Sequence, residues 1–168
     1  MADQEKNPTY WDQLLKLRDE DRARKANSLT LIKGKDLPKE LNQQGIMRWY
    51  MHPRKEDTCI KTMMIYSLEI PPGSKSGLVK YQGGQVIYVW QGKGHTVLDG
   101  VQHFWKASDV VQLPLRPKGV TYQHFNDDPE NPAVLFCVEP NTVDALGLDR
   151  GSGFEQLDEC PEYKKLNK

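Results

Sequence analysis

Two stretches of the chain decide the fold: residues 73–92, GSKSGLVKYQGGQVIYVWQG, and residues 117–126, PKGVTYQHFN. Each begins at a glycine or proline turn and continues into β-branched and aromatic residues. An alternation of apolar and polar residues is typical of strands that bury one face. Between the two stretches, Asp99-Gly100 separates two more alternating runs and predicts a two-residue hairpin. This region is therefore expected to form an antiparallel sheet.

Similar short runs extend on both sides of these stretches. They are evenly spaced and separated by turns, which favours an antiparallel sandwich or barrel. The predicted strands are Leu29–Ile32, Ile46–Met51, Ile60–Ile70, Gln85–Trp90, His95–Leu98, Val101–Trp105, Val110–Leu113, Val120–Phe125 and Ala133–Glu139.

The N-terminal segment has a helical pattern instead. Asn7 is a suitable N-cap and Pro8 suits the first helical position, so a helix is predicted over residues 8–26. Its apolar stripe includes Trp11 and Leu14. This stripe is expected to pack on the chain's own barrel or on another chain.

The sequence predicts three parts. Residues 1–45 form an N-terminal helix and arm, residues 46–139 form the barrel, and residues 140–168 form a polar C-terminal tail on its surface. A chain of 168 residues buries roughly 70% of its unfolded surface, enough for a core without disulfide or metal. The expected fold class is all-β, with a single barrel.

The composition argues against several classes of protein. Lys+Arg and Asp+Glu both number 23, so there is no long-range attraction to nucleic acid or to an anionic membrane. No apolar run reaches the roughly 20 residues of a membrane span, and the polar N-terminus lacks a secretory signal. The three cysteines form no CxxC pair. We expect a cytoplasmic protein without nucleic-acid or membrane partners.

The two stretches resemble the paired motifs of the cupin superfamily. The first motif places two histidines and a glutamate between two glycines, and the second runs from Pro-x-Gly to a histidine and an asparagine. Both spacings match to the residue, and the resemblance covers roughly residues 68–139. It implies a double-stranded β-barrel of jelly-roll type. The matching positions are Gly73, Val79, Tyr81, Gln85 and Gly92, then Pro117, Gly119, Tyr122 and Asn126.

The positions that hold a metal in cupins carry other side chains here. Metal-binding cupins use three histidines and a glutamate, whereas this chain has Val79, Tyr81, Gln85 and Tyr122. Valine has no donor atom, glutamine offers a neutral oxygen, and a phenol has a pKa of about 10. We therefore expect degenerate metal-site positions that line the barrel, no metal or other cofactor in this chain, and no catalytic residue.

His124 is the one histidine close to these positions in the sequence. Because side chains alternate along a strand, it shares a face with Tyr122. It is a candidate polar group of a pocket, either as a single ligand or as a general base. The simpler interpretation is a histidine hydrogen-bonded inside the barrel to a neighbour such as Tyr81 or Gln85.

The whole layout resembles the small subunit of two-component, iron-dependent hydroquinone 1,2-dioxygenases. The shared features are an N-terminal helix, the strand at residues 46–50, a single barrel and a polar tail. In that family the larger cupin subunit is understood to carry iron, and the small subunit is metal-free. The resemblance implies that this chain, inactive alone, supports a larger iron-bearing cupin subunit in opening the ring of an aromatic diphenol.

Two alternatives stay open. The chain could be a non-enzymatic small-molecule-binding module, with Tyr81, Gln85, Tyr122 and His124 orienting a ligand in the barrel. It could also be a self-sufficient cupin dioxygenase similar to gentisate-cleaving enzymes, although the replaced histidines argue against this.

Overall fold

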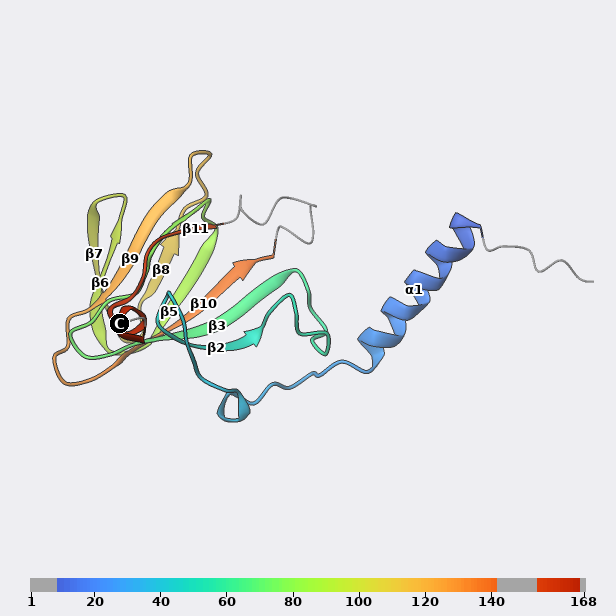
Figure 1. Ribbon diagram of the computed structural model, residues 1–168, viewed down its shortest axis with the longest axis horizontal. Coiled ribbons are helices and arrows are strands. Elements are labelled where there is room, and N and C mark those ends of the chain that lie inside the picture. The colour runs from blue at the N-terminus through green and yellow to red at the C-terminus, as the bar shows by residue number, and fades with distance from the viewer. Residues whose placement is uncertain (1–8, 142–153, 167–168) are drawn as a thin grey trace, which may run out of the picture.

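The computed structural model describes residues 9–141 and 154–166. Two antiparallel sheets enclose the core, and a helix projects away from them (Figure 1). This confirms the predicted all-β jelly-roll barrel with an N-terminal helix. Among the described residues, no helix is long and apolar enough to cross a membrane.

The larger sheet has six strands in the order β1-β2-β3-β10-β5-β8, and the smaller has five in the order β11-β4-β9-β6-β7. The strands of the larger sheet are β1 (Glu40–Leu41), β2 (Ile46–Met51), β3 (Met63–Ile70), β5 (Gln85–Gln91), β8 (Val110–Leu113) and β10 (Ala133–Pro140). Those of the smaller sheet are β4 (Leu78–Tyr81), β6 (Lys93–Leu98), β7 (Val101–Lys106), β9 (Val120–Asn126) and β11 (Phe154–Asp158).

The core lies between the inward faces of the two sheets. Along β10, every second residue from Ala133 to Glu139 is buried, and the residues between them are partly exposed. This is the period-two pattern of a strand with one face toward the core. Buried side chains from both sheets meet there, for example Leu68 and Leu135 from the larger sheet and Val120 from the smaller.

Asn126, the last residue of the second motif, ties several turns together. Its side-chain nitrogen lies 3.0 Å from the carbonyl oxygens of Ile70 and Pro71 and 2.9 Å from that of Asn131. Its side-chain oxygen accepts the backbone N–H of Asp128 at 3.0 Å. Since Asn126 is buried, these bonds satisfy backbone groups that water does not reach easily.

The predicted hairpin is confirmed between β6 and β7. Asp99 and Gly100 have φ angles of 48° and 86°, as a two-residue turn of type I′ requires. The strand predicted at residues 29–32 is wrong, because Leu29 makes only an isolated bridge to Thr58.

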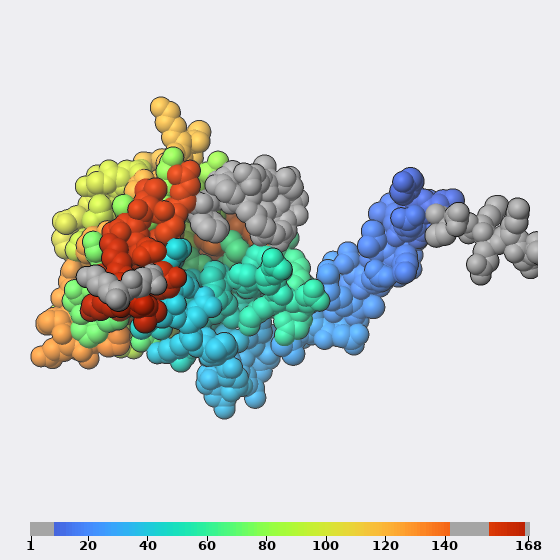
Figure 2. All heavy atoms as spheres, viewed as in Figure 1, coloured from blue at the N-terminus to red at the C-terminus, as the bar shows by residue number. Residues whose placement is uncertain are grey.

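Helix α1 spans Tyr10–Ala26 and is capped by Thr9, which exchanges hydrogen bonds with Asp12 in a capping box. The helix therefore begins two residues after the predicted start at Pro8, because this reciprocal pair fixes its first turn at Tyr10. Asn7 and Pro8 lie outside the described residues. No residue of α1 is buried, and the helix stands away from the barrel (Figure 2). Of the two expected packing options, the structure does not show packing of α1 on the chain's own barrel.

Part of the expected C-terminal tail has regular structure. β11 pairs with β4 at the edge of the smaller sheet, and helix α4 (Pro161–Leu166) follows it. The sequence did not indicate this strand, because its mixed polar pattern, FEQLD, resembles a surface segment. It joins the sheet through backbone hydrogen bonds, which do not depend on an apolar alternation.

Candidate functional site

The two motifs meet inside the barrel. Val79 on β4 is paired in register with Tyr122 on β9, and Tyr81 follows Val79 on the same face of β4. All three line an interior cavity of about 190 Å³. The other residues of the cavity wall are Asn42, Gln43, Gln44, Met47, Trp49, Tyr66, Glu139 and Gln156.

Gln85 lies behind this wall on β5 and is 1% exposed. Its Nε2 atom donates to the hydroxyl of Tyr66 at 2.7 Å and to Oε2 of Glu139 at 2.8 Å. Its Oε1 atom is buried without a hydrogen-bond partner among the described residues. The side chain at the former glutamate position of the motif thus holds another carboxyl group in place.

Sequence reasoning missed Glu139. Acidic side chains are rarely buried, yet Glu139 is 9% exposed. A signal was present, because Glu139 shares the inward parity of Ala133, Leu135 and Cys137 in its predicted strand. The motif comparison drew attention to the four ligand positions instead.

Burial sets the ionisation of the cavity wall. It raises the pKa of Glu139 to about 7, with the hydrogen bond from Gln85 acting in the opposite direction. Burial also raises the pKa values of Tyr66, Tyr81 and Tyr122, and the charge of Glu139 adds to this. The three phenols are therefore neutral at physiological pH, and Glu139 titrates near neutrality.

These residues do not fit a divalent metal. Val79 has no donor atom, the phenols of Tyr81 and Tyr122 hold their protons, and Gln85 offers only the neutral oxygen Oε1, a weaker ligand than the carboxylate that metal-binding cupins have there. Within residues 9–141 and 154–166, no group of three or more His, Cys, Asp or Glu is placed to hold a metal ion. The ligand set of metal-binding cupins has no counterpart in this wall.

We expect the purified chain to hold no stoichiometric iron, manganese, zinc or copper after expression in metal-supplemented medium. The reason is the replaced donor set at Val79, Tyr81, Gln85 and Tyr122. Elemental analysis of the dialysed protein checks this. About one metal ion per chain, lost on Tyr81→Ala or Gln85→Ala, would contradict the expectation.

His124 lies in a separate buried network. The indole Nε1–H of Trp105 donates to Thr96 Oγ1 at 3.0 Å, and this hydroxyl lies 2.8 Å from His124 Nδ1. Because an indole N–H can only donate, the hydroxyl of Thr96 accepts from Trp105 and also bonds to Nδ1 of His124, so the imidazole is tied to the core through this side chain. Burial lowers the pKa of His124 to about 4. His124 is thus a hydrogen-bonded interior histidine and a weak base, with Thr96 as its partner rather than Tyr81 or Gln85.

Glu139 and His124 give opposite pH dependences of stability. Between its ordinary pKa of 4.5 and its folded value of about 7, Glu139 binds more protons in the folded state, so the free energy of unfolding falls as pH rises. Between about 4 and 6.5, His124 binds more protons in the unfolded state, so the same quantity rises with pH. We expect the two slopes to offset each other in the wild type.

In Glu139→Gln, the pH dependence that His124 gives to the free energy of unfolding should no longer be offset. In this variant the free energy of unfolding is expected to rise more steeply from pH 4.5 to 6.5 than in the wild type. Urea denaturation at several pH values measures this, and Glu130→Gln, at an exposed carboxyl, is the control. Parallel profiles for Glu139→Gln and the wild type would show that Glu139 titrates normally.

No protein-family model and no curated protein sequence matches the chain. Solved structures are similar to it. The polyketide cyclase RemF from Streptomyces resistomycificus is 14% identical over 67% of this chain and 79% of that one, with a TM-score of 0.54. A cupin-like protein from Thermotoga maritima is 18% identical over 79% and 90% of the two chains, with a TM-score of 0.52. An uncharacterised double-stranded β-helix protein from Klebsiella pneumoniae is 15% identical over 79% and 100%, with a TM-score of 0.55.

At such identities the similarity concerns the fold alone. The similar solved structures range from a polyketide cyclase to the coconut allergen cocosin, so the fold leaves the activity open. The strand order of the two sheets and the similarity to these solved structures lead to the same conclusion. The chain folds as a cupin-type, double-stranded β-barrel.

Proposed function

We propose that this chain is the metal-free subunit of an iron-dependent aromatic ring-cleaving dioxygenase of the hydroquinone 1,2-dioxygenase type. It supports a larger, iron-bearing cupin subunit, on which the ring of a para-diphenol is opened between a hydroxylated carbon and its neighbour. The observation that carries this proposal is helix α1, whose apolar side chains the chain itself leaves uncovered.

Helix α1 presents large apolar side chains to solvent. Trp11 is 66% exposed, Leu14 is 55% exposed and Leu17 is 59% exposed. Tyr10, Leu14 and Leu17 follow one another at spacings of four and three residues, so they share one face of the helix. Most helical stability in proteins comes from packing of such a face. A partner that covers this face would supply that packing.

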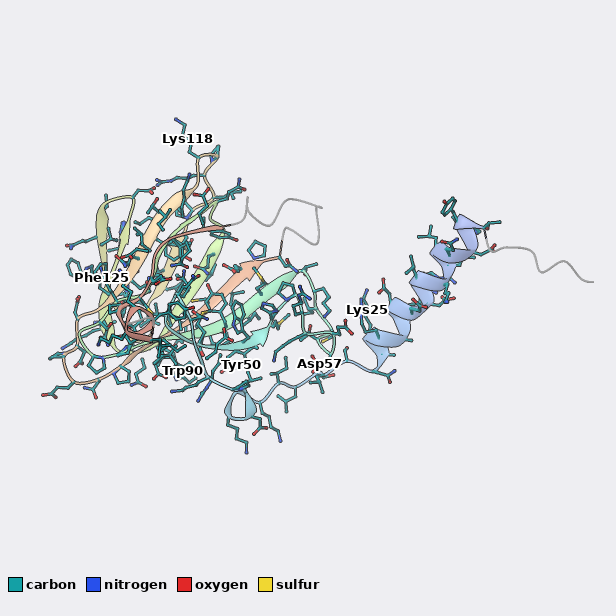
Figure 3. The ribbon with its side chains drawn as sticks, viewed as in Figure 1. Lys25, Tyr50, Asp57, Trp90, Lys118 and Phe125 are labelled. Atoms are coloured by element: carbon teal, nitrogen blue, oxygen red, sulfur yellow. The ribbon has the colours of Figure 1, made fainter. Side chains whose placement is uncertain are left out.

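The rest of the helix surface is suited to solvent at the edge of an interface. Arg24 pairs with Asp21 at 2.7 Å, and Arg22 pairs with Asp19 at 3.8 Å. Lys25, in the last turn, lies where the chain leads back toward the barrel (Figure 3). Charged residues around an apolar centre are typical of protein–protein interfaces.

A second apolar surface lies on the outer face of the larger sheet. Trp90 is 69% exposed there and Tyr88 is 38% exposed. Tyr50, Trp90 and Phe136 line a hollow of about 520 Å³ on this face, and Figure 3 labels the first two near the lower edge of the barrel. Exposed patches of this kind mark interaction sites, so the partner has more than one surface to contact.

The side chains at the metal-ligand positions of the barrel support different roles for the two subunits. Since Val79, Tyr81, Gln85 and Tyr122 do not form a metal site, iron and dioxygen would act on the larger subunit, and this chain would contribute shape and stability.

A non-enzymatic small-molecule-binding module is the second candidate function. The interior cavity favours it, because a barrel without a use for its interior would be expected to fill that space with side chains. A subunit role and a binding role are compatible in one chain.

Co-purification tests the proposed subunit role. The full chain, tagged at its C-terminus, is isolated from its native source under mild conditions, and the proteins that travel with it are identified by mass spectrometry. We expect one larger cupin protein in a stable ratio to this chain. A chain that elutes alone, at the size of a monomer or homo-oligomer, would contradict the proposal.

A further inference from the structure

We propose that the interior cavity binds a small organic ammonium ion, with the carboxylate of Glu139 as its counter-ion and with Trp49, Tyr66, Tyr81 and Tyr122 as an aromatic box around it. This site goes beyond the subunit role. It rests on the second candidate function, binding of a small molecule, and gives that function a ligand class.

The aromatic rings form a large part of the cavity wall. Tyr66, Tyr81 and Tyr122 are each at most 8% exposed, so their rings are held in place by the core. The rings of Trp49 and Tyr66 lie 4.8 Å apart between centroids and are inclined by 52°. The two rings therefore meet at an angle and are not stacked, which is the arrangement of adjacent sides of an aromatic box. Aromatic faces attract a cation, most strongly where water is excluded.

Among the described residues, the wall contains an acidic side chain that no basic side chain balances. Glu139 is the charged residue of the wall as described, and no Lys, Arg or His lines the cavity with it. Its hydrogen bond from Gln85 comes from a neutral amide. A buried carboxylate without a countercharge is costly, and such a group usually takes up a proton instead. A bound ammonium ion would supply the missing charge.

The hydrogen-bond donors near the cavity are mostly used within the protein. Gln44 Nε2 donates to the side chain of Gln156, and Gln156 Nε2 donates to the backbone oxygen of Asp158 at 2.6 Å. The indole N–H of Trp49 donates to Oε1 of Glu40 at 2.7 Å. The phenol hydroxyls of Tyr81 and Tyr122 are donors in the same wall, but the carboxylate of Glu139 beside them repels an anion and accepts from a cation. The wall thus favours a cation over a carboxylate.

The volume limits the ligand. About 190 Å³ corresponds to about six water molecules at ~30 Å³ each, which is room for a compact cation such as choline. Gln43 belongs to the wall and is exposed. The cavity therefore reaches the surface at the turn between β1 and β2.

Three probes of nearly the same shape test the proposal by calorimetric titration of the full-length wild-type chain. Choline carries the cation, 3,3-dimethyl-1-butanol is its neutral analogue, and pivalate carries a carboxylate. We expect choline to bind about tenfold or more tightly than the neutral analogue, a ratio set by the cation–aromatic and ionic attractions. Pivalate should not bind. Equal binding of choline and dimethylbutanol, or no binding of choline, would overturn the proposal.

Variants then assign the binding to this wall. Glu139→Gln and Trp49→Leu should each weaken choline binding by about tenfold. Glu155→Gln, on β11 outside the cavity wall, should leave it unchanged. Circular dichroism establishes that each variant is folded. Choline binding that is unaffected by both cavity variants would place the cation elsewhere and refute the site.

A fourth probe, hydroquinone, separates this inference from its nearest rival. Tighter binding of hydroquinone than of choline to the isolated chain would show a site for a neutral phenol and would overturn the ammonium assignment. None of these titrations includes a larger subunit. Their failure is therefore distinguishable from failure of the subunit proposal, which depends on complex formation.

Discussion

Trp11→Ala is expected to weaken association with the larger cupin subunit by about thirtyfold, which corresponds to about 2 kcal/mol. Trp11 is a large aromatic side chain that is 66% exposed on a helix without a buried residue. Aromatic anchors of this kind often dominate interface energies, because they become fully desolvated in the complex. Surface plasmon resonance with the immobilised larger subunit measures the change.

The melting temperature of the isolated chain decides how this result is interpreted. It should be the same for Trp11→Ala and the wild type, because Trp11 packs against no core residue in the free chain. Phe104→Ala serves as an aromatic control, since Phe104 is 74% exposed on β7. A lower melting temperature with unchanged association would instead mean that the helix closes its own barrel.

Asn126→Ala is expected to lower the free energy of unfolding by about 4 kcal/mol, because several backbone groups lose their partner at once. The carbonyl oxygens of Ile70, Pro71 and Asn131 and the N–H of Asp128 all bond to this one side chain. Some of these groups will regain a bond to water, which keeps the loss below the sum of separate penalties. Urea denaturation of the full chain measures it.

Asn131→Ala is the matched control for this substitution. Asn131 is exposed, and its backbone oxygen, which accepts from Asn126, remains in the variant. A loss within about 0.5 kcal/mol is expected for it. If Asn126→Ala were no more destabilising than this control, the turns at this end of the barrel would be held by other contacts.

Most strands of the fold could be predicted from the sequence, because one buried face imposes a period of two on their side chains. The run from Ala133 to Glu139 is the clearest case. The short strands β1 and β4 and the polar strand β11 could not, since they are defined by backbone pairing with a neighbour. The predicted helix start differs from the observed one for a local reason: the reciprocal bonds of Thr9 and Asp12 fix the first turn at Tyr10.

The candidate site could be predicted in part. The motif spacing placed Val79 and Tyr122 among the residues that line the barrel, and the structure has both in the cavity wall, on the neighbouring strands β4 and β9. The partner of His124 could not be predicted, because Thr96 lies opposite it only through the pairing of β6 with β9. Glu139 was missed because it belongs to neither motif.

Oxygen consumption by purified subunits tests the subunit proposal most directly. The larger cupin subunit, loaded with iron, is given hydroquinone and dioxygen with and without this chain, and ring cleavage is followed at the same time. We predict that neither subunit consumes oxygen alone, that the mixture does, and that Trp11→Ala needs a higher concentration to restore the rate. A larger subunit that is stable and fully active without this chain would contradict the account.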